Sequence, residues 1–152
     1  MRRRPGFTLV EILIVVVILG VLAAIVIPQM SSASTQAIRA HLGRNLQAIE
    51  SQIEIYRANN AGLLPTNDID DPMGEGEAKD GWGILVSSEY LQSEPMNFFA
   101  DSTVLLGGDE ATAIAAGPDV GNGWFYEAVG NTIRVYAAGY DRVNDTLSTD
   151  TP

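Results

Sequence analysis

The sequence contains no cysteine, one histidine and few basic residues, and each shortage narrows its possible chemistry. Without cysteine the chain can form no disulfide, no zinc–thiolate site and no thiol nucleophile. The single histidine, His41, leaves little room for Ser-His-Asp chemistry or for a metal site built from several histidines. A net charge of −10 repels phosphate groups, so a nucleic acid is not an expected partner. These shortages point away from an enzyme.

Charge and hydrophobicity are spread unevenly along the 152 residues. Residues 1–57 carry six arginines and three glutamates, a net charge of +3, whereas residues 58–152 carry 16 acidic and three basic residues, a net charge of −13. The run 7–27 contains a single charge, Glu11. A helix of that length spans roughly 31 Å, close to the hydrocarbon thickness of a bilayer. The pattern predicts one membrane-spanning helix followed by an acidic head in water.

Three arginines at positions 2–4 stand before the apolar run, and the positive-inside rule keeps them in the cytoplasm. The run could be a permanent anchor. It could also be a secretory signal peptide, with small residues up to Ala33 for cleavage before Ser34. Neither alternative explains Glu11, because a carboxylate in a membrane helix costs on the order of 3 kcal/mol and marks a functional site by default.

The segment Gly6-Phe7-Thr8-Leu9-Val10-Glu11, behind a short basic leader, resembles the N-terminal signature of type IV pilins and of the pseudopilins of type II secretion systems. The resemblance implies that a prepilin peptidase cuts between Gly6 and Phe7 and that Phe7 is then N-methylated. It also implies that Glu11 is the glutamate used in assembly. Pilin-like proteins often carry a proline where this chain has Pro28.

The chemistry of this segment supports the role that the resemblance implies for Glu11. Cleavage removes the arginines and leaves an α-amine on Phe7, which is largely protonated because its ordinary pKa is about 8. An amine that pairs with Glu11, in the same or a neighbouring subunit, removes an unpaired charge from a low dielectric. We expect Glu11 to set the axial register between subunits. Pro28 predicts a kink near Ala24, or alternatively the end of the helix.

The next apolar residues recur every three or four positions, which is the spacing of one helix face. They are Ile38, Leu42, Leu46, Ile49, Ile53 and Tyr56. Asn59-Asn60-Ala61-Gly62 supplies a stop signal. The pattern predicts one long helix with a transmembrane part, 7–27, and an amphipathic part, 28–60, whose stripe packs on a small head.

Two runs near the end of the chain are typical of strands. Residues 124–129 and 132–137 flank Gly130-Asn131, a two-residue hairpin signal of type II′. A third run, 103–106, is expected to pair with them. Three short antiparallel strands packed against the helix predict an α+β fold, with a leader at 1–6 and a globular head at 61–152.

The head narrows the resemblance to the major pseudopilin of type II secretion systems. Leu64-Pro65-Thr66, Tyr90-Leu91 and the Pro95/Asn97 pair are similar to that family's pattern, and Phe98 departs from it. Several such proteins bind calcium in a C-terminal loop, which here would use Asp141, Asn144 and Asp145. Clustered Asp and Asn oxygens suit calcium, but a solvated acidic tail is the alternative.

The resemblance implies a homopolymeric filament that drives protein export. Its precursor would lie in the inner-membrane lipid, with the head in the periplasm. The expected partners are prepilin peptidase, an inner-membrane assembly platform and minor pseudopilins. Two alternatives remain, a type IV pilus subunit for adhesion, motility or DNA uptake and an exported soluble binding domain. The lack of cysteine favours the pseudopilin, because pilins commonly close a C-terminal loop with a disulfide.

Overall fold

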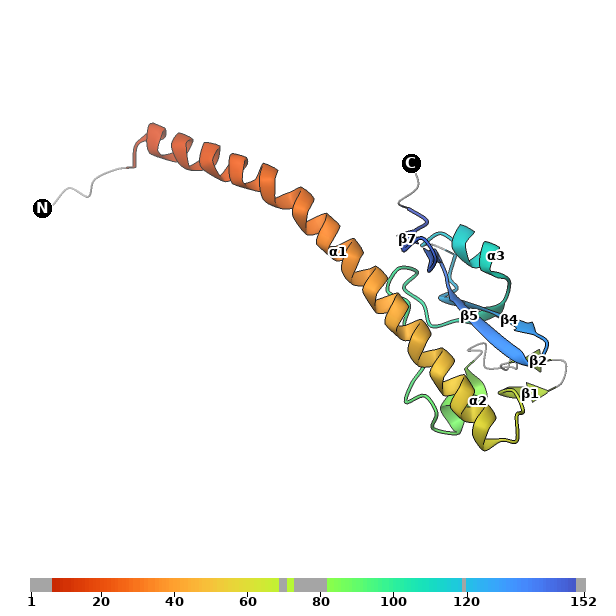
Figure 1. Cartoon of the computed structure of the whole chain (residues 1–152). Helices are drawn as coiled ribbons and strands as arrows, with labels where there is room; N and C mark the ends of the chain where they lie inside the picture. The colour runs from red at the N-terminus through yellow and green to blue at the C-terminus, as the bar shows by residue number, and fades with distance from the viewer. Residues whose placement is uncertain (1–6, 69–70, 73–81, 119, 150–152) are drawn as a thin grey trace, which may run out of the picture. The chain divides into compact units, whose positions relative to one another are not determined.

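The computed structural model describes residues 7–68, 71–72, 82–118 and 120–149 (Figure 1). The chain divides into two compact units, Met1–Ala37 and Ile38–Pro152. The predicted leader, 1–6, lies outside the described residues. Helix α1, Leu9–Asn59, begins in the first unit and continues into the second.

Helix α1 is 51 residues long and continues through Pro28 without a break. The alternative in which Pro28 ends the helix is therefore wrong, whereas the kink stays a prediction. The helix stops where the sequence signals it. Ala61 and Gly62 have φ values of 56° and 84°, and the Gly62 N–H donates to the Arg57 carbonyl at 2.8 Å. A left-handed residue after the last turn is a common way to end a helix.

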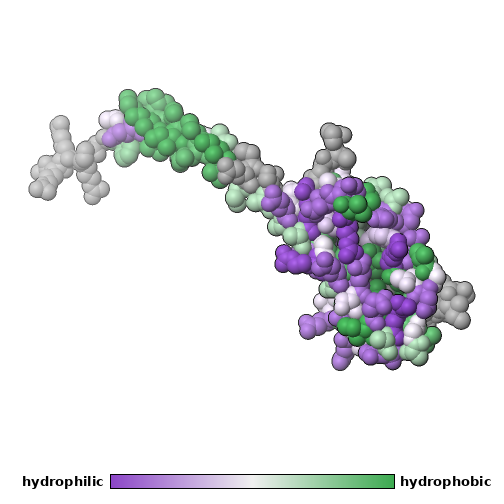
Figure 2. Space-filling model, in the orientation of Figure 1, coloured by the Kyte–Doolittle hydropathy of each residue, from purple (hydrophilic) through white to green (hydrophobic). Residues whose placement is uncertain are grey.

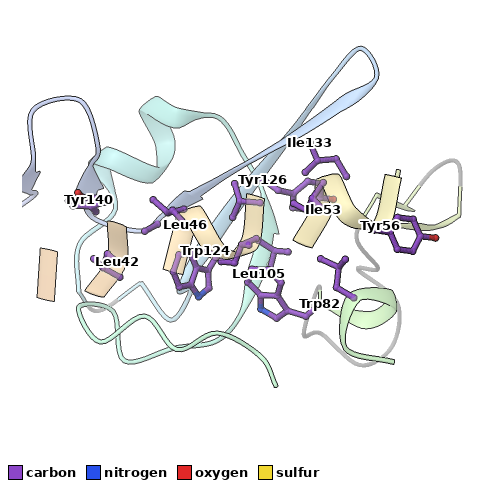
Figure 3. Packing of buried hydrophobic residues seen from close by; sticks show 14 of the residues in the cluster. Leu42, Leu46, Ile53, Tyr56, Trp82, Leu105, Trp124, Tyr126, Ile133 and Tyr140 are labelled. Carbon is purple, nitrogen blue, oxygen red and sulfur yellow. The ribbon is translucent and has the colours of Figure 1, made fainter. Parts of the chain in front are cut away.

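The predicted apolar stripe of α1 forms one wall of the core (Figure 3). Its members from Leu42 to Ile53 are at most 2% exposed, Tyr56 is 8% exposed, and Ile38 packs partly buried against them. Trp82, 1% exposed, belongs to the same cluster. Burying a large aliphatic side chain stabilises a fold by about 2 kcal/mol, so this stripe is what fixes the helix to the head.

The sheet of the head has the order β3-β4-β5 and is mixed. Strands β4, Trp124–Val129, and β5, Thr132–Ala137, form the predicted antiparallel hairpin, and Gly130 has the positive φ, 62°, that a type II′ turn needs. Strand β3, Leu105–Gly107, pairs with β4 in parallel. The expectation of three antiparallel strands is corrected here, while the α+β class is confirmed.

The parallel pairing has a physical cause in the connection between β3 and β4. Parallel strands need a crossover of a dozen or more residues, usually through a helix. Helix α3, Glu110–Ala115, lies in that connection and is capped by Asp109, whose carboxylate accepts the Thr112 N–H at 2.8 Å. In the sequence this segment is rich in glycine, so the pattern does not predict the helix α3 that sets the direction of β3.

The two faces of the sheet bury different clusters. Trp124 and Tyr126 of β4 face the stripe of α1, whereas Phe125 joins an alanine-rich cluster with α3. This alternation is that of a strand buried on both faces. The remaining short elements surround these layers. They are β1 Thr66–Asp68, β2 Asp71–Pro72, α2 Gly83–Ser87, β6 Tyr140–Asp141 and β7 Thr146–Leu147.

Asn97 is a fully buried polar residue that joins the loop before β3 to the sheet. Its side-chain N–H groups donate to the carbonyls of Gly123 and Ala138 at 2.7 and 3.1 Å. Its side-chain oxygen accepts the backbone N–H groups of Phe99 and Ala100 at 2.8 and 3.1 Å. A buried amide is tolerated when its hydrogen bonds are made, and here both ends of the amide are satisfied.

Candidate functional site

The start of helix α1 is a capping box formed by Thr8 and Glu11. The Thr8 backbone N–H and hydroxyl both donate to Glu11 Oε2, at 2.8 and 2.6 Å. The Glu11 N–H in turn donates to Thr8 Oγ1 at 3.3 Å. Thr8 is thus the N-cap and Glu11 the third helical residue, and each satisfies a donor that the first helical turn leaves open.

The capping box explains how one chain tolerates Glu11 at the head of an apolar helix. The carboxylate accepts hydrogen bonds and lies at the positive end of the helix dipole, where an anion is favoured. The Thr-x-x-Glu spacing was available in the sequence as a signal of this arrangement. Sequence reasoning considered Glu11 alone and missed the contribution of Thr8.

Phe7 precedes the cap and is 76% exposed, whereas Gly6 lies outside the described residues. The structure therefore places the residue expected to become the new N-terminus directly beside the capped turn. The alternative cleavage point, between Ala33 and Ser34, lies inside α1.

Behind the cap, the helix surface is apolar on the face that Figure 2 shows, and consecutive large hydrophobic side chains are exposed along it. The segment Leu9–Ile27, 19 residues of mean hydropathy 3.3, is long and apolar enough to cross a membrane, and none of it is buried. The large hydrophobic side chains from Ile12 to Val26 each expose 49–58% of their surface. A helix that is hydrophobic all round requires lipid or other helices around it.

The residues suggested for calcium lie at the β6–β7 turn, where three of their carboxylate oxygens accept hydrogen bonds from the protein. Asp141 Oδ1 accepts the N–H groups of Val143 and Asn144 at 2.9 and 3.0 Å, and Asp141 Oδ2 accepts the Asn144 amide at 2.7 Å. The Tyr140 hydroxyl donates to Asp145 Oδ1 at 3.0 Å. In the described part of the chain, no three His, Cys, Asp or Glu residues gather as a metal site.

These contacts shift the pKa values of two residues in the turn, Asp141 and Tyr140. The Asn144 backbone N–H, with its side-chain amide, holds the pKa of Asp141 below its ordinary value. Burial, reinforced by the hydrogen bond to Asp145, raises the pKa of Tyr140. The turn is thus closed by its own hydrogen bonds, and calcium binding by these residues stays a prediction.

Comparison with known proteins agrees with the geometry at the N-terminus. The family model described as the prokaryotic N-terminal methylation motif matches residues 1–27. A type II secretion system core protein G from Pseudomonas aeruginosa is 34% identical over 101 residues, which are 63% of this chain and 68% of that protein. The chain belongs to this family. This family, the major pseudopilins, is the one that the sequence resemblance indicated.

Other members of the core protein G family show the same likeness. The protein from Dickeya chrysanthemi is 34% identical over 103 residues, 68% of this chain and 60% of the relative's length. The protein from Escherichia coli K12 is 28% identical over 121 residues, 77% of this chain and 83% of the relative. No solved structure matches the chain. Family membership and the apolar helix together indicate a membrane-anchored protein.

Proposed function

We propose that this chain is a structural subunit, not an enzyme, of a type II secretion pseudopilus that drives protein export. Prepilin peptidase cleaves it between Gly6 and Phe7, and Phe7 is then N-methylated. One observation carries the proposal: a capped carboxylate, Glu11, at the start of an apolar helix segment, Leu9–Ile27, of which nothing is buried among the described residues. The match of residues 1–27 to the methylation motif supports it.

Before assembly, lipid covers the apolar part of α1. The arginines at positions 2–4 hold the N-terminus in the cytoplasm, and the acidic head lies in the periplasm. On assembly, an inner-membrane platform and minor pseudopilins extract the subunit. Helices α1 of neighbouring copies then replace the lipid around Leu9–Ile27. The hydrophobic contact area is then retained, so extraction does not leave an apolar surface in water.

Glu11 changes partner in this transition. In the single chain its carboxylate accepts from Thr8, and in the filament it accepts from the Phe7 amine of a neighbour. A carboxylate paired with an amine cation in a low dielectric is held more strongly than one that accepts only from neutral donors, and leaving the carboxylate unpaired there is costly. The exchange therefore favours the one axial register in which every carboxylate meets an amine.

Three variants separate the capping role of Glu11 from its role between subunits. Glu11→Leu removes both. Glu11→Gln keeps a side chain that can complete a capping box but removes the charge, and Thr8→Val removes the cap but keeps the charge. We expect the two Glu11 variants to insert and to be cleaved normally but to lose filaments, whereas Thr8→Val retains more filaments than either.

The measurement is filament yield by shearing and electron microscopy, with mass spectrometry of the N-terminus to confirm cleavage after Gly6. If Glu11→Gln assembles like the unmodified chain, Glu11 is only a helix cap and the register role is wrong. If Glu11→Leu also assembles, the carboxylate has no part in assembly.

A further inference from the structure

Two of the exposed apolar features of the described head are of particular interest. One is Val143, at the tip of the β6–β7 turn, which is 83% exposed, more than any other large hydrophobic side chain described in residues 38–149. The other is a groove of about 320 Å³ beside α1. We call these the Val143 knob and the Phe98 groove. The groove is lined by His41, Ala48, Leu91, Glu94, Met96 and Phe98.

The Phe98 groove is a built feature and not a loose loop. The Phe98 ring meets His41 edge-on with centroids 4.6 Å apart, yet remains 56% exposed. The Asn45 amide donates to the Met96 carbonyl at 3.3 Å and fixes the loop to α1. An aromatic side chain held in one orientation with half of its surface in water offers contact area at little further entropic cost.

The knob and the groove lie on opposite sides of α1. Arg142, next to Val143, forms an ion pair with Glu50, whereas the groove contacts His41. Glu50 follows His41 by nine residues, roughly two and a half turns of helix, which places the two positions half a turn apart around the axis. When two different surfaces of one subunit fit each other, repeated contact is heterologous and builds a ring or an open filament, not a two-fold dimer.

Charge also matches across the two features. Arg142 and Arg134 are the described cations of the acidic segment 82–149, and the Arg142 side chain remains 44% exposed in its pair with Glu50. Glu94 lines the groove, and its carboxylate is held in place by the Thr103 hydroxyl at 2.8 Å. Heads of the same negative charge repel, so a head-to-head contact is favoured where a cation meets an acid.

We propose that Val143 of one subunit inserts into the Phe98 groove of a second copy of this chain, with Arg142 facing Glu94. The inference rests on the proposed function, since it assigns a contact between heads to a chain that polymerises through α1. It adds a second, peripheral point of attachment to the one at Glu11, and this contact is accessible to water.

The absence of native cysteine makes a direct test possible. Val143→Cys and Ala48→Cys are combined in one chain, and assembled filaments are oxidised and run on a non-reducing gel. A disulfide forms only where the two Cα atoms approach within about 7 Å. We expect a ladder of dimers, trimers and higher multiples. The control pair Leu63→Cys with Ala48→Cys, whose Leu63 is 67% exposed after the end of α1, gives no ladder.

Each other outcome overturns the inference in a recognisable way. Filaments without a ladder show that assembly occurs but not through this contact. A product that stops at the dimer shows a closed two-fold contact, and a band that is not a multiple of the subunit shows another protein in the groove. Failure of the unmodified chain to form filaments overturns the proposed function, and this inference with it.

A second pair of variants measures the contribution of the contact. Val143→Asp reduces filament yield by about tenfold, the effect of losing one buried valine contact per subunit. Val129→Asp, at a half-exposed position on the β4–β5 hairpin, leaves the yield unchanged. Unchanged melting of both variants confirms intact heads. Equal losses of filaments in the two would contradict a specific role for Val143.

Discussion

The two parts of helix α1 bury their side chains in different ways. In Ile38–Tyr56 the apolar residues lie on one face, and the members from Leu42 to Tyr56 are 0–8% exposed against the head. In Leu9–Ile27 they lie on every face and none is buried. The first pattern supplies a core within one chain, whereas the second requires lipid or other helices. The comparison teaches that the head has a core within one chain, whereas the apolar part of the helix needs an apolar environment from outside the chain.

The largest expected effect comes from replacing a leucine by alanine in each of the two parts of α1. Leu46→Ala removes a side chain that is 2% exposed and should lower the stability of the head by about 2–5 kcal/mol through the cavity it leaves. Leu19→Ala removes one that is 57% exposed and should leave the melting of the head unchanged. Thermal denaturation of the full chain in detergent measures both. An equal drop in the two variants would show that the helix unfolds as a single unit.

Acid provides a smaller perturbation that acts on the head. The pKa of Asp141 is lowered in the folded state by N–H donors that the unfolded chain lacks. Its stabilising effect is therefore present above the ordinary aspartate pKa of about 4 and is lost as pH falls below it through the folded value. Asp141→Asn should flatten part of the acid limb when melting temperature is recorded from about pH 2 to pH 7. Identical profiles for the two chains would contradict this role.

Calcium should have the smallest effect. The β6–β7 turn is closed by hydrogen bonds of Asp141 and Asp145, so we expect neither a chelator nor about 1 mM calcium to change the melting temperature of the head. A rise with calcium that disappears in Asp145→Ala would show that these side chains rearrange into a metal site.

Local patterns in the sequence were enough to predict the elements whose structure depends on neighbouring residues. The stripe of α1 follows from helical spacing, and the β4–β5 hairpin follows from Gly130-Asn131 between two alternating runs. The residues at the start of the site are likewise contiguous in the chain, although only Glu11 and not its cap Thr8 was predicted. The methylation-motif match over residues 1–27, together with the core protein G relatives, confirms the family that this segment indicated.

Features that depend on distant residues could not be predicted in the same way. The direction of β3 is set by a crossover through α3, which pairs Leu105 with Trp124. The role of Asn97 depends on Gly123 and Ala138, which approach it only in the folded head. The Phe98 groove similarly needs α1 and a loop about fifty residues later, so no sequence window contains it.

The central claim is that the uncovered part of α1 becomes the core of a filament after its leader is removed. Mass spectrometry of the chain recovered from sheared filaments tests it most directly. The account predicts an N-methylated Phe7 as the first residue of the assembled subunit. A chain that still begins at Met1 in the filaments, or one that begins at Ser34, would contradict it.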